Sequence, residues 1–266
     1  MPPSIQILPT AADLFCAAAS EFVSAGKTAI AARGRFTVAL SGGSTPRSLY
    51  SVLAQDHAGF AWSQTHLFFG DERHVPPTDR DSNYRMVSEA LLTRISIPVA
   101  NVHRVPAENL DAAAAAQSYE NELRSFFQLP PAPPISQQLH SPDPSSPSGR
   151  LHPECFPRFD LILLGMGPDG HTASLFPGSD GLKEQSRIVM ANWVAELQAY
   201  RITFTFPVLN RAAEVMFLAA GADKADMVHQ VLEAQNSPPY PSQQVRPSDG
   251  KLLWMLDEAA AAKLSR

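Results

Sequence analysis

The sequence predicts an α/β fold in which a mostly parallel sheet is covered by helices on both faces. Two observations support this. Short apolar runs typical of buried strands, such as 36–40 and 160–164, recur along the chain. They alternate with longer segments whose apolar residues follow helical spacing. This alternation is typical of parallel strands joined by crossover helices, and 266 residues are ample for one hydrophobic core.

The first helix is predicted with clear signals at both ends. We expect it to run from Thr10 to Arg33. Thr10 and Asp13 suit a capping box at its start, and Gly34 suits the left-handed residue that ends many helices. These local signals place the helix directly before strand 36–40.

The next helix is expected to follow strand 36–40 after a short turn. Thr45 suits the capping position of this helix, and Pro46 fits its first turn. The further strands that the alternation predicts are 66–69, 101–105, 160–164, 187–194, 201–206, 214–220 and 252–256. The further helices are 82–95, 110–127, 223–234 and 257–264.

Residues 129–158 interrupt this alternation. They contain nine prolines and five serines, and no apolar periodicity runs through them. Such a composition is typical of an exposed or disordered insertion. Because strands and helices continue in the same style on both sides, we expect a single domain over 1–266 with an insertion at about 129–158. Residues 236–249 are expected to form a shorter loop of the same character.

Composition excludes several classes of protein. The net charge of −5 argues against nucleic acid or anionic lipid as the main partner. The two cysteines, Cys16 and Cys155, do not make a disulfide framework. The chain starts without a secretory signal pattern, and its apolar runs are shorter than a membrane span. We therefore expect a cytoplasmic protein without a membrane or nucleic-acid partner.

Three segments with unusual polar content follow predicted strands, where open α/β sheets bind their ligands. The first is 41–46, which contains Gly42, Gly43, Ser44 and Thr45. Paired glycines let the backbone approach a ligand, and the following helix presents free N–H groups that suit a phosphate. An ordinary turn from strand to helix explains this segment equally well.

The second segment contains Asp71 and Arg73, directly after strand 66–69. Arg73 offers a planar donor fork that suits a phosphate. A surface salt bridge is the plainer interpretation of these charged residues. On this segment alone, the salt bridge is favoured over the phosphate site.

The third segment begins with Gly165, Gly167 and Gly170 after strand 160–164. This spacing suggests a dinucleotide-binding turn. Pro168 stiffens that turn, however, and Pro177 ends any following helix after about two turns, whereas the dinucleotide fold needs a longer helix. A rigid turn is the better interpretation.

Such a turn would place Asp169 and His171 at the tip of the strand. A histidine there is able to take a proton from water. Two cationic residues lie further along the chain, where Arg201 begins strand 201–206 and Lys224 lies near a helix start. A lysine is unusual at a positively polarised helix start. A ligand phosphate or simple solvation explains it about equally well.

Taken together, these segments resemble the 6-phosphogluconolactonase family. They are SGGSTP at 41–46, GDERHVPPTDRDSNYRM at 70–86, GMGPDGHTASLFPG at 165–178, RITFTFPVLNRA at 201–212, GADKA at 221–225 and RPSDGKLLWMLDEAAA at 246–261. Each motif alone is weak to moderate. Their common order, over nearly the whole chain outside the insertion, makes the resemblance highly specific.

The resemblance implies a Rossmann-like fold similar to that of glucosamine-6-phosphate deaminases. It implies hydrolysis of 6-phospho-D-glucono-1,5-lactone to 6-phosphogluconate, the second step of the pentose phosphate pathway. It implies no cofactor and no metal. The expected partner is the small sugar-phosphate lactone, and we expect a monomer or a weak homodimer.

Site roles follow from the same resemblance. His171 would be the general base, and Asp169 would orient it. The residues that would line the sugar-phosphate pocket are Gly42, Gly43, Ser44 and Thr45. Positive charge for the phosphate and the oxyanion would come from Arg73, Arg201 and Lys224. Asp71 would hold sugar hydroxyls or an arginine.

Three other functions compete with this hypothesis. A glucosamine-6-phosphate deaminase/isomerase needs further acids and bases, yet the segment after His171, 173–177, carries no carboxylate. A non-catalytic sugar-phosphate sensor usually accompanies a DNA-binding module, for which the sequence shows no helix-turn-helix and no basic arm. A dehydrogenase rests only on the glycine turn discussed above.

Overall fold

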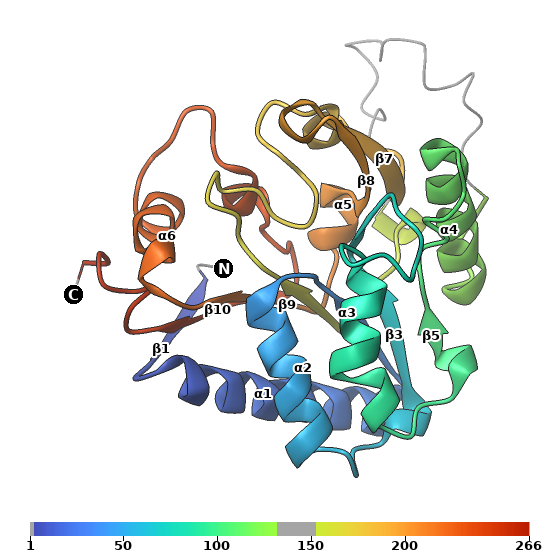
Figure 1. Cartoon of the computed structure of the whole chain (residues 1–266), viewed down its shortest axis with the longest axis horizontal. Coiled ribbons are helices and arrows are strands. Elements are labelled where there is room, and N and C mark those ends of the chain that lie inside the picture. Colours follow the sequence, from blue (N-terminus) through green and yellow to red (C-terminus); the bar gives the residue numbers. More distant parts are fainter. Residues whose placement is uncertain (1–2, 132–152, 266) are drawn as a thin grey trace.

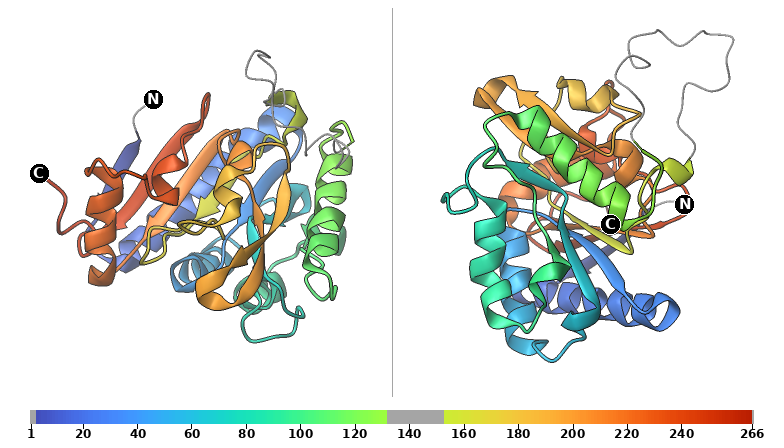
Figure 2. Two further views of the ribbon diagram at one scale, coloured as in Figure 1. Left: turned by 90° about the horizontal axis from the view of Figure 1, so that it is seen from above. Right: turned by 90° about the vertical axis from the view of Figure 1, so that its right-hand side faces the viewer.

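The structure is a computed structural model that describes residues 3–131 and 153–265. Its centre is a seven-stranded sheet in which every pair of neighbours is parallel, with the strand order β1-β10-β9-β6-β2-β3-β5 (Figure 1). The strands are β1 (Ser4–Leu8), β2 (Phe36–Leu40), β3 (Thr65–Phe69), β5 (Val102–His103), β6 (Leu161–Leu164), β9 (Glu214–Ala219) and β10 (Lys251–Asp257). The left view of Figure 2 places β1 near one end of the molecule and α4, which neighbours β5, at the other.

A second, three-stranded sheet is antiparallel, with the order β4-β8-β7. Its strands are β4 (Asp71–Arg73), β7 (Val189–Val194) and β8 (Ala199–Phe204). The helices are α1 (Ala11–Arg33), α2 (Ser44–Asp56), α3 (Asn83–Ala90), α4 (Ala112–Phe126), α5 (Phe206–Leu209) and α6 (Ala225–Leu232). Short 3₁₀ turns lie at Trp62–Gln64, Leu92–Arg94, Val99–Asn101, Pro153–Cys155, Asp180–Lys183, Ala195–Leu197, Ala222–Lys224 and Pro241–Gln244.

Helices flank both faces of the large sheet, as the sequence predicts. Phe22 of α1 packs edge-to-face on Phe36 of β2. Phe126 of α4 packs in the same way on Phe68 of β3, whose neighbour in the parallel register is Ala39. Since side chains alternate along a strand, residues 36 and 39 of β2 point to opposite faces. Helices α1 and α4 therefore cover opposite faces, and α4 also contacts β7 and β8 (Figure 1).

Most of the predicted elements are confirmed to within a few residues. At α1, Thr10 Oγ1 accepts from the Asp13 amide (3.2 Å), and Gly34 ends the helix at a φ of 72°. The predicted helix 82–95 is shorter, because α3 ends at Ala90 and continues only as a 3₁₀ turn. The predicted insertion 129–158 lies largely outside the described residues.

Two local predictions are wrong. Thr45 does not cap α2, because the helix already begins at Ser44, and Gly43 takes the capping position without a side-chain bond. Residues 257–264 do not form a helix. Asp257 ends β10, and its carboxylate accepts from the backbone N–H groups of Gly221 (3.0 Å) and Ala260 (2.7 Å), which holds the following residues in turns.

Strands β1 and β4 and helix α5 were not predicted from the sequence. Strand β1 is mostly exposed, and this includes the side chains of Ile5 and Ile7. The sequence also did not separate β7 and β8 from the parallel sheet. Among the described residues, no helix combines the length and the hydrophobicity that a membrane span requires.

Candidate active site

A cavity of about 540 Å³ opens at the carboxyl ends of β2, β3, β6 and β9. Its walls come from the loop after β2, from β4, from the turn after β6, from the β7–β8 hairpin and from the segment after β9. All residues that the sequence predicted for the site lie in this lining, namely Gly42, Gly43, Ser44, Thr45, Asp71, Arg73, Asp169, His171, Arg201 and Lys224. The structure therefore brings them together, and their chemical roles stay predictions.

The loop after β2 needs both of its glycines, for different reasons. Gly43 adopts a φ of 103°, which side-chain-bearing residues rarely adopt. Gly42 lies against Asn83 of α3, so that a Cβ atom at position 42 would lie 1.9 Å from Asn83 Oδ1. Helix α2 begins immediately afterwards without a side-chain cap. No described residue caps its first N–H groups, which leaves them able to bind an anion in the cavity.

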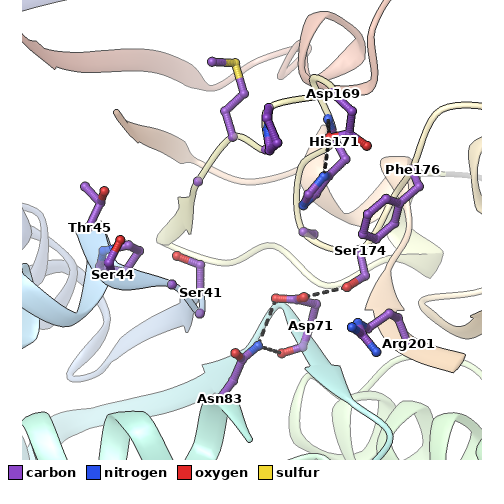
Figure 3. Close-up of a pocket in the computed structure, with 18 of the residues that line it drawn as sticks. Ser41, Ser44, Thr45, Asp71, Asn83, Asp169, His171, Ser174, Phe176 and Arg201 are labelled. Atoms are coloured by element: carbon purple, nitrogen blue, oxygen red, sulfur yellow. Dashed lines mark hydrogen bonds and ion pairs between the residues drawn. The ribbon is translucent and has the colours of Figure 1, made fainter. Parts of the chain in front are cut away.

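His171 and Asp169 form a hydrogen-bonded pair on the turn after β6. The His171 Nδ1 atom lies 2.5 Å from Asp169 Oδ1 (Figure 3). Burial works to raise the pKa of Asp169, but the hydrogen bond and the charge of His171 outweigh it, so that the pKa is lowered. An ionised carboxylate accepts a hydrogen bond from the Nδ1 proton. In the neutral imidazole the free lone pair therefore lies on Nε2.

The turn that carries this pair is tightly built. The Gly167 N–H donates to the His171 carbonyl (2.9 Å), and a Cβ atom at Gly167 would lie 2.1 Å from His171 Nδ1. Gly170 has a φ of 75°. Its carbonyl accepts from the Ser242 hydroxyl (2.8 Å) and the Ser242 N–H (3.0 Å). The segment 236–249, predicted only as a loop, thus supports the turn from behind.

Arg73 and Arg201 form the cationic wall of the cavity. They are register partners across the antiparallel strands β4 and β8. Among residues 3–131 and 153–265, no carboxylate lies within 4.0 Å of either guanidinium group. Arg73 donates to the Asp81 carbonyl. The pKa of Arg201 is lowered by burial and by the charge of Arg73. The pair is therefore available for an anion.

Asp71 and Lys224 complete the predicted charges. Asp71 Oδ2 accepts from the Ser174 hydroxyl (2.6 Å), and Oδ1 accepts from Asn83 Nδ2 at 3.4 Å (Figure 3). Its carboxylate is thus held by neutral donors rather than by an arginine. Lys224 lies directly before α6, as predicted, with Nζ 3.7 Å from Asp223 Oδ2.

Several polar or aromatic residues of the lining were not assigned from the sequence, and three of them contact predicted site residues: Asn83, Ser174 and Phe176. Asn83 and Ser174 are buried and bond Asp71 from two directions. Phe176 stacks on His171. All three lie inside the motif segments 70–86 and 165–178, but only their contacts in the folded chain distinguish them from neighbouring residues. The described part of the chain shows no cluster of His, Cys, Asp or Glu suited to a metal ion.

Comparison with known proteins agrees with this architecture. Residues 9–254 match the family model described as glucosamine-6-phosphate isomerases/6-phosphogluconolactonase. The chain belongs to this family, which confirms the predicted relationship to the glucosamine-6-phosphate enzymes.

Individual members of the family are similar over most or all of the chain. A 6-phosphogluconolactonase from Nostoc sp. is 38% identical over 266 residues, covering 100% of both chains. One from Synechocystis sp. is 41% identical and covers 89% of this chain and 88% of its own. The structure of 6-phosphogluconolactonase from Trypanosoma cruzi has a TM-score of 0.84 at 28% identity, covering 100% of this chain and 99% of that chain.

Proposed function

We propose that this protein hydrolyses 6-phospho-D-glucono-1,5-lactone to 6-phospho-D-gluconate in the oxidative pentose phosphate pathway. One observation carries the proposal. A histidine whose Nδ1 is bonded to a carboxylate shares a cavity with two arginines that have no carboxylate partner among the described residues. Lactone hydrolysis needs one base and stabilisation of negative charge, and this cavity contains groups suited to both. The names of the Nostoc and Synechocystis relatives support the same activity.

His171 would act first as a base and then as an acid. Nε2 takes a proton from water while the water oxygen attacks the lactone carbonyl carbon. The carbonyl oxygen becomes an oxyanion, which nearby cationic groups stabilise. As the carbonyl re-forms, the ring C–O bond breaks, and the imidazolium gives its proton to the departing ring oxygen. Asp169 keeps Nδ1 protonated throughout, so that Nε2 stays the reactive nitrogen.

The substrate phosphate would be bound by positive groups in the same cavity. The candidates are the start of α2 after Gly43, the Arg73–Arg201 pair and Lys224. Fixing the phosphate at one end of the cavity would position the lactone carbon for attack. Asp71 would accept hydrogen bonds from sugar hydroxyls, since the described residues that bond its carboxylate are neutral donors.

We extend the proposal to the setting in which the enzyme works. We expect it to act in the cytoplasm, as a monomer or weak homodimer, on a small-molecule substrate and without nucleic acid. The net charge of −5 supports the last point.

The test is an assay with freshly generated 6-phosphogluconolactone, with spontaneous hydrolysis subtracted. The wild type should accelerate hydrolysis, and His171→Ala should lose about 10²- to 10⁴-fold in kcat. His229→Ala is the matched control, because His229 Nδ1 is also bonded to a carboxylate (Glu233 Oε2, 3.0 Å) but lies on α6 outside the cavity lining. It should retain full activity.

Three other results of these assays would change the proposal. Activity that persists in His171→Ala would support the proposed reaction but contradict the role of His171 as its general base. A wild type without lactonase activity that released ammonia from glucosamine 6-phosphate would establish the deaminase alternative. Tight binding of sugar phosphates without turnover would favour the sensor.

A further inference from the structure

The imidazole of His171 is covered on one face by the ring of Phe176. The ring centroids lie 4.1 Å apart, and the planes are inclined by 25° (Figure 3). Phe176 lines the same cavity and is only partly buried. The two rings therefore meet at the cavity wall, where a proton must be taken up and released.

Phe176 is itself held firmly by its chain neighbours. Leu175 is fully buried. Ser174 bonds Asp71 through its hydroxyl, and its backbone N–H donates to Thr203 Oγ1 (3.1 Å). On the other side, the Ser179 hydroxyl donates to the Phe176 carbonyl (2.8 Å). The backbone on both sides of Phe176 is thus anchored where its ring stacks on His171.

The bond to Asp169 does not by itself determine where Nε2 points. Rotation about the bond between Cβ and the ring is broad in histidine, and a single hydrogen bond constrains only one atom of the ring. Gly167 lies close to one edge of the imidazole, where a Cβ atom would be 2.1 Å from Nδ1 and 2.2 Å from Cε1. The ring of Phe176 closes one face. Together these contacts restrict the orientations that the imidazole can take.

The stack also offers an aromatic face to the imidazolium that would form during hydrolysis. An aromatic face attracts a cation, and the attraction grows where water is partly excluded. The His171 side chain is 25% exposed. When the imidazole takes a proton from water, its contact with Phe176 becomes more favourable than in the neutral state.

We propose that Phe176 is a positioning residue for the general base, and that its ring orients His171 and stabilises the imidazolium formed during hydrolysis. This inference rests on the proposed function. It differs from two plainer roles of an apolar side chain at this place. If Phe176 only fills space, any apolar residue of similar size should replace it without loss of activity. If its ring only contacts the substrate, its replacement should change KM.

The variants Phe176→Leu and Phe176→Tyr separate these roles. Leucine keeps an apolar side chain but removes the ring, whereas tyrosine keeps the ring. Trp193→Leu is the control, because Trp193 is an exposed aromatic residue outside the cavity lining. Circular dichroism and thermal unfolding should show that all variants are folded.

The expected kinetic result is a split between kcat and KM. Phe176→Leu should lower kcat on the order of tenfold with KM within about twofold, whereas Phe176→Tyr should stay near the wild type. In Phe176→Leu the acid limb of the pH profile should move to lower pH, because the imidazolium loses a favourable contact. The charged groups in the cavity lining are unchanged in every variant: Asp71, Arg73, Asp169, Glu196, Arg201 and Lys224.

A second readout does not depend on turnover. The side-chain ¹⁵N resonances of His171, assigned with the His171→Ala variant, should titrate at lower pH in Phe176→Leu than in Phe176→Tyr or the wild type. An unchanged kcat and titration in Phe176→Leu would overturn the inference, as would a rise in KM alone. An inactive wild type with the expected shift in titration would support the positioning role and overturn only the proposed reaction.

Discussion

Arg73 and Arg201 lie directly opposite each other on the antiparallel strands β4 and β8. Like charges in such cross-strand positions are destabilising. In the described part of the chain no carboxylate lies within 4.0 Å to compensate them, and the pKa of Arg201 is lowered by burial and by its neighbour. Asp71, Asp81 and Glu72 oppose this lowering, and we expect an anion in the cavity to stabilise the pair further.

Phosphate binding should therefore raise the stability of the protein. Inorganic phosphate should increase Tm of the wild type, because it binds only the folded state. Arg201→Gln should abolish this increase and raise KM for the lactone by about 10- to 100-fold, as expected for lost charge-assisted hydrogen bonds. Differential scanning fluorimetry and steady-state kinetics measure the two effects. Arg80→Gln is the control, since the Arg80 side chain is 88% exposed. An equal Tm increase in Arg201→Gln would contradict the prediction.

Asp169→Asn should reduce kcat on the order of a hundredfold with little change in KM. An asparagine amide is able to donate to Nδ1 and so favours the wrong tautomer of His171. Burial works to raise the pKa of Asp169, but the hydrogen bond and the charge of His171 outweigh it, so that the wild-type carboxylate is held in its ionised form beside Nδ1. Asp180→Asn, in an exposed Asp180–Lys183 pair, should have wild-type kinetics. A wild-type kcat in Asp169→Asn would contradict the role of Asp169 in orienting His171.

Gly167→Ala should leave the protein folded but lower kcat about a hundredfold, because the added methyl group displaces the imidazole. The new Cβ would lie 2.1 Å from His171 Nδ1, while no left-handed φ is required at this glycine. Gly59→Ala is the matched control, since a Cβ there meets nothing within 4 Å. Circular dichroism and kinetics on both variants provide the measurement. Full activity of Gly167→Ala would show that the imidazole tolerates the shift.

Two buried glutamates should respond in opposite ways to replacement by glutamine. The pKa of Glu214 is raised by burial and by the charge of Glu21, against the opposing effect of Lys251, and its Oε1 atom has no hydrogen-bond partner among the described residues. A raised folded-state pKa contributes stability below the unfolded value, and this contribution is lost as pH rises through the folded value. Glu214→Gln should therefore raise the urea midpoint at about pH 8 and have little effect at about pH 4.

Glu72→Gln is the counterpart. The pKa of Glu72 is also raised, by burial above all, but Oε1 accepts from the Asn83 N–H (2.7 Å) and Oε2 from the Tyr84 N–H (2.8 Å). A glutamine places an NH₂ group against one of these donors. We expect a loss of about 1–3 kcal/mol in the free energy of unfolding. The same urea titrations measure it, and a gain in stability would contradict the assignment of these bonds.

Local physical signals determined much of the fold in advance. Helical spacing and end signals predicted α1, and apolar runs predicted β2 and β6. The turns after these strands carry Gly42, Gly43, Asp169 and His171, because a parallel sheet gathers the carboxyl ends of its strands at one edge. The order of such motifs along the chain was sufficient to predict the family and the candidate site residues.

Only the tertiary structure decided the contacts that join distant segments. The alanine-rich end at 257–264 has high helix propensity, but Asp257 bonds Gly221 and the chain turns instead. The pairing of Arg73 with Arg201, the support of Gly170 by Ser242 and the stack of Phe176 on His171 leave no periodic pattern in the sequence. Hydrophobic periodicity and capping depend on neighbours within about four residues, whereas cross-strand register and ring packing depend on how whole elements dock. The sequence by itself thus predicted many of the residues that gather at the cavity, whereas the folded chain added Asn83, Ser174 and Phe176 and decided how all of them face one another.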